Sequence, residues 1–167
     1  MQSSILGTRL VHWPDEAACA ASAARLAGHS GLADAFIELH GPLGAGKTTF
    51  ARYLLAALGV EGRVKSPTYT LMEPYRSDAA HGGFPIAHFD FYRFDDDQEW
   101  EDAGFRDVFA RPGLKLVEWP EKAAGLLPAC DLRITIAPRP GADDEDGSEA
   151  RDARFEALSE RGRELLA

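Results

Sequence analysis

Cysteine is scarce in this chain of 167 residues: Cys19 and Cys130 are the only two, and they lie far apart without metal-ligand spacing. The pattern argues against a disulfide or a zinc site and predicts buried or incidental thiols. Long apolar runs are missing as well. No stretch approaches the roughly 20 residues of a membrane span, and residues 1–11 lack an apolar run of signal-peptide length. We therefore expect a cytoplasmic protein.

Basic residues are outnumbered, with 18 Lys and Arg against 27 Asp and Glu and a formal net charge of −9. A broad electrostatic grip on nucleic acid or an anionic membrane needs clustered Lys and Arg. The charge argues against both, although a local basic patch stays possible. Apolar residues make up 45% of the chain and no repeat is visible, so we predict one domain spanning residues 1–167.

Apolar periodicity predicts strands and helices that alternate over much of the chain. Six segments have the pattern of strands: 35–40, 68–73, 84–89, 114–119, 132–137 and 153–158. Helical spacing, N-cap residues or terminal glycines indicate four helices: 15–27, 47–58, 95–103 and 159–166. The polar segment 76–83 is expected to join two of the strands as a hairpin, and residues 138–147 are expected to form an exposed acidic loop.

The most informative segment is the loop Gly41-Pro42-Leu43-Gly44-Ala45-Gly46-Lys47-Thr48, between an expected strand and an expected helix. Its glycines let backbone N–H groups approach a triphosphate that side chains would obstruct. Lys47 can neutralise the β- and γ-phosphates, Thr48 can offer its hydroxyl to Mg²⁺, and Thr49 can add a phosphate contact. An ordinary strand-to-helix turn would explain the glycines, but it would not explain why the whole motif lies between a strand and a helix. The loop predicts nucleoside triphosphate binding and an α/β fold with a P-loop NTPase-like sheet, mostly parallel with antiparallel hairpins, and helices on both faces.

The rest of the sequence narrows the nucleotide and the reaction class. An Asn-Lys-x-Asp guanine reader and a Leu-Ser-Gly-Gly-Gln signature are both absent, which favours ATP over GTP and argues against an ABC-type ATPase. Asp90 and Glu118 follow or end predicted strands, where this fold presents carboxylates to Mg²⁺ and to the attacking water. Spacing alone does not assign the two roles. The alternative is that Asp90 caps a turn and Glu118 is a solvated strand end.

Four motifs in order resemble those of the bacterial TsaE (YjeE) family. They are GPLGAGKTTF at 41–50, VKSPTYTL at 64–71, HFDFYR at 88–93 and VEWPE at 117–121. The resemblance implies an ATP- and Mg²⁺-dependent ATP hydrolase that acts with TsaD and TsaB, and with tRNA indirectly through that complex. The implied process is threonylcarbamoyladenosine modification of tRNAs that read codons beginning with A.

The resemblance also implies roles for individual residues. Asp90 would be the catalytic carboxylate, assisted by Lys47, and Thr48 and Glu118 would hold Mg²⁺. The nucleotide would contact Glu16, Leu43, Gly44, Ala45, Gly46, Lys47, Thr48 and Thr49.

Other positions keep two interpretations. Ser66-Pro67-Thr68 resembles a switch-like loop near the γ-phosphate, but turn chemistry also explains it. Tyr92, Arg93 and Trp119 can serve the site, contact a partner or simply pack. The family often has a Gly-Arg pair near the C-terminus that this chain lacks. Arg151 or Arg154 is the candidate replacement.

Two other functions remain open at this point. One is a small-molecule kinase with Asp90 as base and Arg93 or Arg106 gripping the acceptor. Segment 76–83 is poor in the Arg residues that a kinase lid carries, which argues against it. The other is a nucleotide-gated binding module with negligible hydrolysis.

Overall fold

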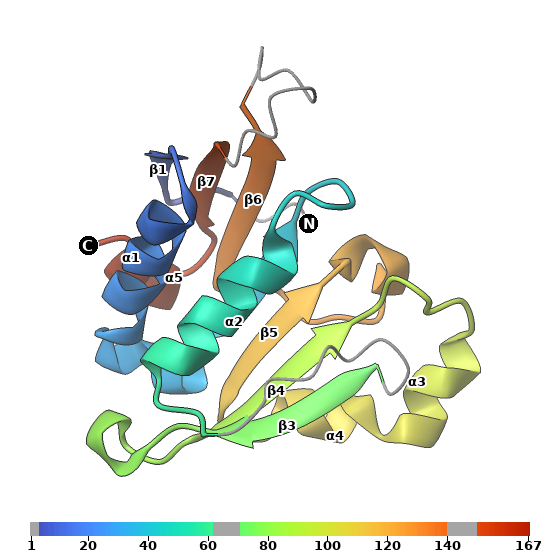
Figure 1. Ribbon diagram of the computed structural model, residues 1–167. Coiled ribbons are helices and arrows are strands. Elements are labelled where there is room, and N and C mark those ends of the chain that lie inside the picture. Colours follow the sequence, from blue (N-terminus) through green and yellow to red (C-terminus); the bar gives the residue numbers. More distant parts are fainter. Residues whose placement is uncertain (1–3, 62–70, 140–149) are drawn as a thin grey trace.

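The computed structural model describes residues 4–61, 71–139 and 150–167, which form one seven-stranded sheet flanked by helices (Figure 1). The strand order is β1-β7-β6-β2-β5-β4-β3. Strands β6, β2, β5 and β4 run parallel at the centre, while β1, β7 and β3 pair antiparallel at the edges. The bounds are β1 Gly7–Trp13, β2 Phe36–His40, β3 Met72–Arg76, β4 Pro85–Asp90, β5 Leu114–Glu118, β6 Leu132–Pro138 and β7 Arg151–Ala157.

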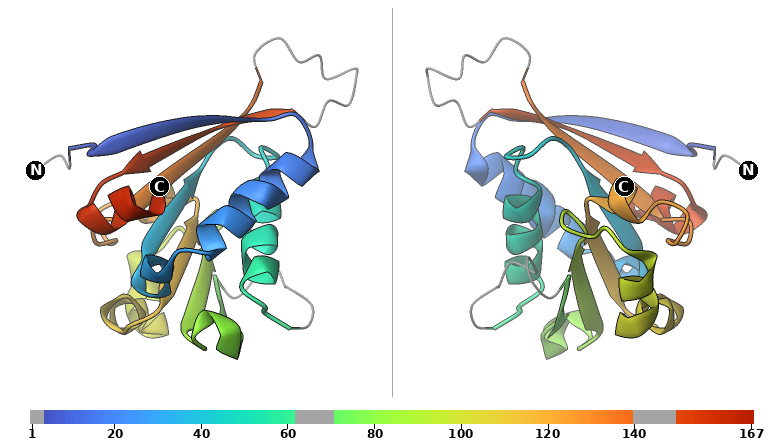
Figure 2. Two further views of the ribbon diagram at one scale, coloured as in Figure 1. Left: turned by 90° about the vertical axis from the view of Figure 1, so that its left-hand side faces the viewer. Right: turned by 90° about the vertical axis from the view of Figure 1, so that its right-hand side faces the viewer.

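Helices cover both faces of the sheet, as predicted. Helices α1 and α2 lie on one face and α3 and α4 on the other (Figures 1 and 2). The bounds are α1 Glu16–Ala27, α2 Lys47–Ala57, α3 Asp97–Ala103, α4 Phe105–Ala110 and α5 Glu160–Leu165. Three short 3₁₀ helices are η1 Ser30–Asp34, η2 Ala79–His81 and η3 Pro120–Ala123. The α/β class with a parallel centre is therefore confirmed.

Side-chain alternation along the central strands builds two apolar cores. On β2, Ile37 and Leu39 point into the core under α1 and α2, and Phe36 points into the opposite core. On β5, Leu116 points into the core under α1 and α2, and Val117 points into the opposite core. Successive residues of a strand face opposite sides, and a parallel sheet is covered on both. This is why these strands read as continuous apolar runs.

Capping residues mark the ends of two helices, and at Asp15 the cap is the one expected from the sequence. Asp15 accepts a 2.9 Å hydrogen bond from the backbone N–H of Ala18 and caps α1, and Gly28 ends that helix. Ser159 caps α5 by accepting from the N–H of Gly162 at 3.0 Å. Helix α4 was not predicted, because Gly104 interrupts the pattern immediately after α3.

Strand β1 was also missed, and its burial explains why. Leu10 points outward and is 75% exposed, whereas Arg9 is half-buried on the inner side with Val11 and Trp13. Polar and apolar residues therefore do not alternate between the exposed and buried sides of this strand, as they would in a typical half-buried strand. Antiparallel pairing with β7, from Gly7 to Trp13, is what makes this segment a strand.

The expected strand 68–73 needs correction. Residues 68–70 lie outside the described part, and β3 begins at Met72 and continues to Arg76. It extends further because it pairs antiparallel with β4 over its whole length. Pro74 is tolerated there because β3 is an edge strand. The predicted hairpin to β4 is confirmed, with η2 in its connection, whereas residues 140–147 of the expected acidic loop are not described.

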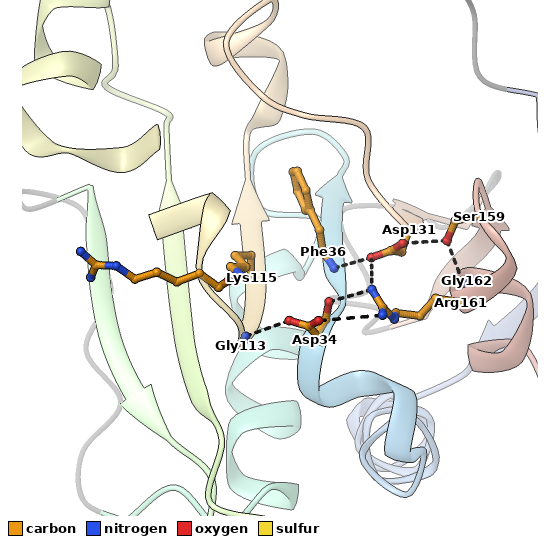
Figure 3. Close-up of polar contacts among 9 residues, drawn as sticks. Asp34, Phe36, Gly113, Lys115, Asp131, Ser159, Arg161 and Gly162 are labelled. Carbon is orange, nitrogen blue, oxygen red and sulfur yellow. Dashed lines mark hydrogen bonds and ion pairs between the residues drawn. The ribbon is translucent and has the colours of Figure 1, made fainter. Parts of the chain in front are cut away.

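A polar cluster ties together the amino ends of the central parallel strands (Figure 3). Asp131 accepts from the buried N–H of Phe36 at 2.8 Å and from the Ser159 hydroxyl at 2.7 Å. The guanidinium of Arg161 lies 3.9 Å from carboxylate oxygens of both Asp34 and Asp131. Strands β2 and β6 are thereby anchored to α5, which leaves their carboxyl ends to build a site.

Both cysteines are free and buried, as predicted. Burial raises the pKa of Cys19 to about 11 and that of Cys130 to about 12, so neither thiol is reactive near neutral pH. Within the described residues, none of the helices has the length and apolar character needed to cross a membrane.

Candidate nucleotide-binding site

The loop from Gly41 to Gly46 joins the carboxyl end of β2 to the amino end of α2. Gly41, Gly44 and Gly46 have φ angles of 145°, 78° and 106°, in the region that favours glycine. A Cβ at Gly41 would lie 2.2 Å from the carbonyl oxygen of Ile136 on β6. Gly41 is thus required both by its backbone angle and by its close approach to the neighbouring strand. The loop leads directly into α2, whose N-terminus favours an anion.

Lys47, the first residue of α2, lies across the loop and is only 4% exposed. Its Nζ donates a 2.6 Å hydrogen bond to the Gly41 carbonyl and lies 3.3 Å from the centroid of the Trp119 ring. Burial lowers the pKa of Lys47, while the charges of Glu118, Glu121 and Asp90 oppose that shift. The ammonium group is therefore held at the mouth of the loop, where it is less hydrated than the side chain of an exposed lysine.

Thr48 and Glu118 meet although they lie on different elements. The Thr48 hydroxyl donates a 2.6 Å hydrogen bond to Glu118 Oε1 at the end of β5. A hydroxyl that donates its proton keeps oxygen lone pairs for a cation, and oxygen is the ligand that Mg²⁺ prefers. No group of three or more His, Cys, Asp or Glu suited to a metal occurs among the described residues. A Mg²⁺ ion at Thr48 would therefore need oxygens from phosphates and water as well.

Asp90 ends β4 directly beside Glu118. The two residues are register partners in the parallel pair β4–β5, and Asp90 accepts a 2.9 Å hydrogen bond from the N–H of Tyr92. Burial raises the pKa of Asp90, the Tyr92 N–H lowers it, and the nearby Glu118 charge raises it further. The pair therefore offers two carboxylates at adjacent strand ends, with an environment that disfavours charge on Asp90.

These groups line one cavity of about 400 Å³. Its walls comprise Leu43, Gly44, Ala45, Gly46, Lys47, Thr48, Thr49, Asp90, Tyr92, Arg93, Glu118 and Trp119. Every residue predicted for the nucleotide, the metal or catalysis lies here except Glu16. The rings of Tyr92 and Trp119 pack with centroids 5.0 Å apart on one side of the cavity.

Glu16 lies elsewhere in the described structure. It is the first residue of α1, and its carboxylate accepts a 2.8 Å hydrogen bond from the Tyr53 hydroxyl on α2. It is not among the residues that line the cavity. The Ser66-Pro67-Thr68 segment lies outside the described residues.

Of the two C-terminal arginines, Arg151 is the one beside the loop. Its Nε donates a 3.1 Å hydrogen bond to the Ala45 carbonyl. Arg154 is on the same strand, but its exposed side chain has Nε 3.4 Å from Oε1 of the buried Glu156. Sequence reasoning left this choice open because it depends on the pairing of β7 with β1 and β6.

Sequence reasoning gave no role to His88, which contacts the site from beneath. The side chain is fully buried on β4, and its Nε2 lies 2.6 Å from Glu118 Oε2. The only signal was its place in the segment 88–93, two residues before Asp90.

Known proteins share the sequence pattern and the fold of this chain. The family model described as "Threonylcarbamoyl adenosine biosynthesis protein TsaE" matches residues 13–145. The chain is 47% identical to the protein of that name from Haemophilus influenzae, over 60% of this chain and 61% of the relative. The identity to the Bacillus subtilis protein is 38%, over 75% of this chain and 71% of the relative. The crystal structure of Bacillus subtilis YdiB superimposes with a TM-score of 0.70 and 26% identity, covering 98% of this chain and 95% of that one.

Proposed function

Because the chain belongs to the TsaE family of threonylcarbamoyladenosine biosynthesis proteins, we propose that it is a Mg²⁺-dependent ATPase that supports this tRNA modification. It acts with TsaD and TsaB on tRNAs that read codons beginning with A, and it meets tRNA through that complex. The chain spans 61% of the length of the Haemophilus relative.

One observation carries the proposal: a phosphate-binding loop and two carboxylates line the same cavity. Loop residues 43–49 share that cavity with Asp90 and Glu118, which come from separate strands. A loop alone would support nucleotide binding and nothing more. Carboxylates beside it support hydrolysis, because one can secure a cation and the other can orient a water.

Each group of residues in the site has a separate role in the proposed reaction. The loop backbone and Lys47 bind the phosphates, and Lys47 moves from the Gly41 carbonyl to a phosphate oxygen when ATP enters. Thr48 and Glu118 would hold Mg²⁺, which supplies neutralisation of the charge that develops on the phosphate oxygens. Asp90 orients the attacking water and accepts its proton. Because its pKa is raised, Asp90 has a higher proton affinity than an ordinary carboxylate, which favours it as the proton acceptor.

The charge of the chain supports an accessory role. With a net charge of −9, the protein lacks the excess of Lys and Arg that phosphate-backbone affinity requires. Contact with tRNA therefore belongs to its partners. The scarcity of Arg in segment 76–83 argues against the alternative of a small-molecule kinase, which would need a basic lid over the phosphates.

The test is ATP hydrolysis by the protein alone, with candidate small-molecule acceptors, and with TsaD, TsaB and tRNA. We expect phosphate release that needs Mg²⁺, no phosphorylated acceptor, and multiple-turnover tRNA modification only when the protein is present. Multiple turnover without it would refute the accessory role. Phosphate appearing on an acceptor would instead establish the kinase.

A further inference from the structure

His88 occupies the middle of the sheet and has no part in the chemistry described so far. Its side chain is 0% exposed, and Nε2 lies 2.6 Å from Oε2 of Glu118, whose side chain is only 2% exposed. Register explains the contact: Asp90 pairs with Glu118 in β4–β5, and His88 lies two residues earlier on the same face of β4. The imidazole therefore lies beneath the carboxylate, away from the cavity.

Glu118 is held from both sides by this arrangement. Oε1 accepts the Thr48 hydroxyl at 2.6 Å and Oε2 contacts His88 at 2.6 Å. A carboxylate with a single partner can rotate or tilt, whereas one with a partner at each oxygen has a defined plane. The direction of the Thr48 hydroxyl thus depends on His88 through Glu118.

The second ring nitrogen indicates what the imidazole is doing. Nδ1 of His88 is buried and has no hydrogen-bond partner in the described structure. The Nε2–H tautomer makes a good bond to the carboxylate and leaves only an acceptor unpaired. A buried polar atom without a partner is unfavourable, and an apolar side chain of similar size would avoid that penalty. A histidine here is poorly explained by packing alone.

We propose that His88 is a positioning residue, which holds Glu118 so that the Thr48 hydroxyl presents its free oxygen lone pair to the nucleotide-bound cation. This inference rests on the proposed function, since it assigns how that site orients its cation ligand. Supporting partners of this kind commonly change metal affinity or activity by about 10- to 100-fold when removed.

The test compares two variants that differ in one property. His88→Gln keeps an N–H donor near the position of Nε2, and His88→Met fills similar space without a donor. ATP affinity is measured by calorimetry first with EDTA and then across a Mg²⁺ titration. Long-range ¹H–¹⁵N spectra of the wild-type imidazole, without nucleotide, report the tautomer.

We expect the Nε2–H tautomer in the wild type. His88→Met should need at least about 10-fold more Mg²⁺ than the wild type for the same gain in ATP affinity. Its ATP affinity in EDTA should be unchanged. His88→Gln should have a Mg²⁺ requirement close to that of the wild type. An unchanged Mg²⁺ requirement in His88→Met would overturn the proposal. So would an equal loss of affinity with and without Mg²⁺, or an Nδ1–H tautomer.

A matched control is Lys115→Met, which removes another buried polar side chain from the adjacent strand. Lys115 donates to the Arg111 carbonyl toward the other end of β5 and does not line the cavity. It should lower thermal stability without changing the Mg²⁺ requirement. If the wild type binds ATP without any dependence on Mg²⁺, both the proposed function and the role of His88 are refuted. If the wild type depends on Mg²⁺ and His88→Met has the same Mg²⁺ requirement, only the role of His88 is refuted.

Discussion

Thr48 and Glu118 are 70 residues apart in the chain, yet the hydroxyl of one donates a 2.6 Å hydrogen bond to the carboxylate of the other. The contact exists because β2 and β5 are parallel neighbours, so the residues after their carboxyl ends meet at one edge of the sheet. Ligands of open α/β sheets bind at this edge. The bond joins the glycine-rich loop region to the acidic strand ends, so that both line one cavity.

Replacing Lys47 should strongly weaken ATP binding. Lys47→Ala deletes a buried cation at the mouth of the loop, and losing one member of a buried charge pair typically weakens binding on the order of 100-fold. Calorimetry with ATP and Mg²⁺ measures the change. Lys122→Ala, an exposed lysine on η3, is the control and should bind as the wild type does. Equal affinities for all three proteins would show that the site is misassigned.

Asp90→Asn should separate binding from turnover. The amide oxygen can still accept from the N–H of Tyr92, but it cannot take a proton from water, so turnover should fall about 100-fold or more. ATP affinity should stay within a few-fold. Single-turnover hydrolysis beside a binding titration gives both quantities. Normal hydrolysis by the variant would exclude Asp90 as the catalytic carboxylate.

The same variant should stabilise the protein in a pH-dependent manner. The pKa of Asp90 is raised, mainly by burial, so the folded state favours the protonated carboxyl. That contribution to stability is complete below the ordinary Asp range and is lost as the pH rises through the raised pKa. Asp90→Asn should therefore melt at a higher temperature than the wild type near neutral pH, and the difference should shrink toward acid pH. A difference that grew on acidification would contradict the sign of the shift.

Two glycines of the loop should differ in what alanine does to folding. Gly41→Ala meets both a φ of 145° and the Ile136 carbonyl at 2.2 Å from its Cβ, and we expect a loss of about 3 kcal/mol in the free energy of unfolding. Gly44 has a φ of 78°, and among the described residues a Cβ there would have no atom within 4 Å apart from its chain neighbours, so Gly44→Ala should lose only about 1 kcal/mol. Urea denaturation distinguishes them. Equal losses would mean that the contact with β6 is relaxed.

Arg151 should affect the site and Arg154 should not. Arg151→Ala removes the hydrogen bond that holds the Ala45 carbonyl of the loop in place. Because a bond from a charged donor is worth about 1.5 kcal/mol and the loop binds in this shape, ATP affinity should fall by up to about 10-fold. The ATP affinity of Arg154→Ala, on the same strand, should stay within about two-fold of the wild type, since Arg154 contacts Glu156 and does not line the cavity. The comparison uses the same ATP titration, and a larger effect at Arg154 would reverse the assignment.

The amino-end cluster should matter for stability alone. Asp131→Ala leaves the buried N–H of Phe36 and the Ser159 hydroxyl without their acceptor, which should lower the free energy of unfolding by about 2 to 3 kcal/mol. Asp131→Asn retains one acceptor oxygen and should lose less. ATP affinity of the folded protein should not change, because the cluster lies at the amino ends of the strands (Figure 3), whereas the cavity lies at their carboxyl ends.

The amino-acid sequence by itself determined the local features of this protein. Glycine spacing predicted the loop, apolar runs predicted the central strands, and Asp15 predicted the start of α1. These are properties of a few neighbouring residues, set by sterics and by side-chain periodicity. The family followed from motifs of the same kind.

Only the tertiary structure decided which distant groups share a site. The contacts of Glu118 with Thr48 and His88, and of Arg151 with the loop, depend on strand order and register, which neighbouring residues do not encode. The same is true of β1, whose own polarity pattern is scrambled and which becomes a strand through its pairing with β7. Long-range pairing brings together residues that have no local relationship, and the acidic and basic groups around the loop acquire their geometry in that way.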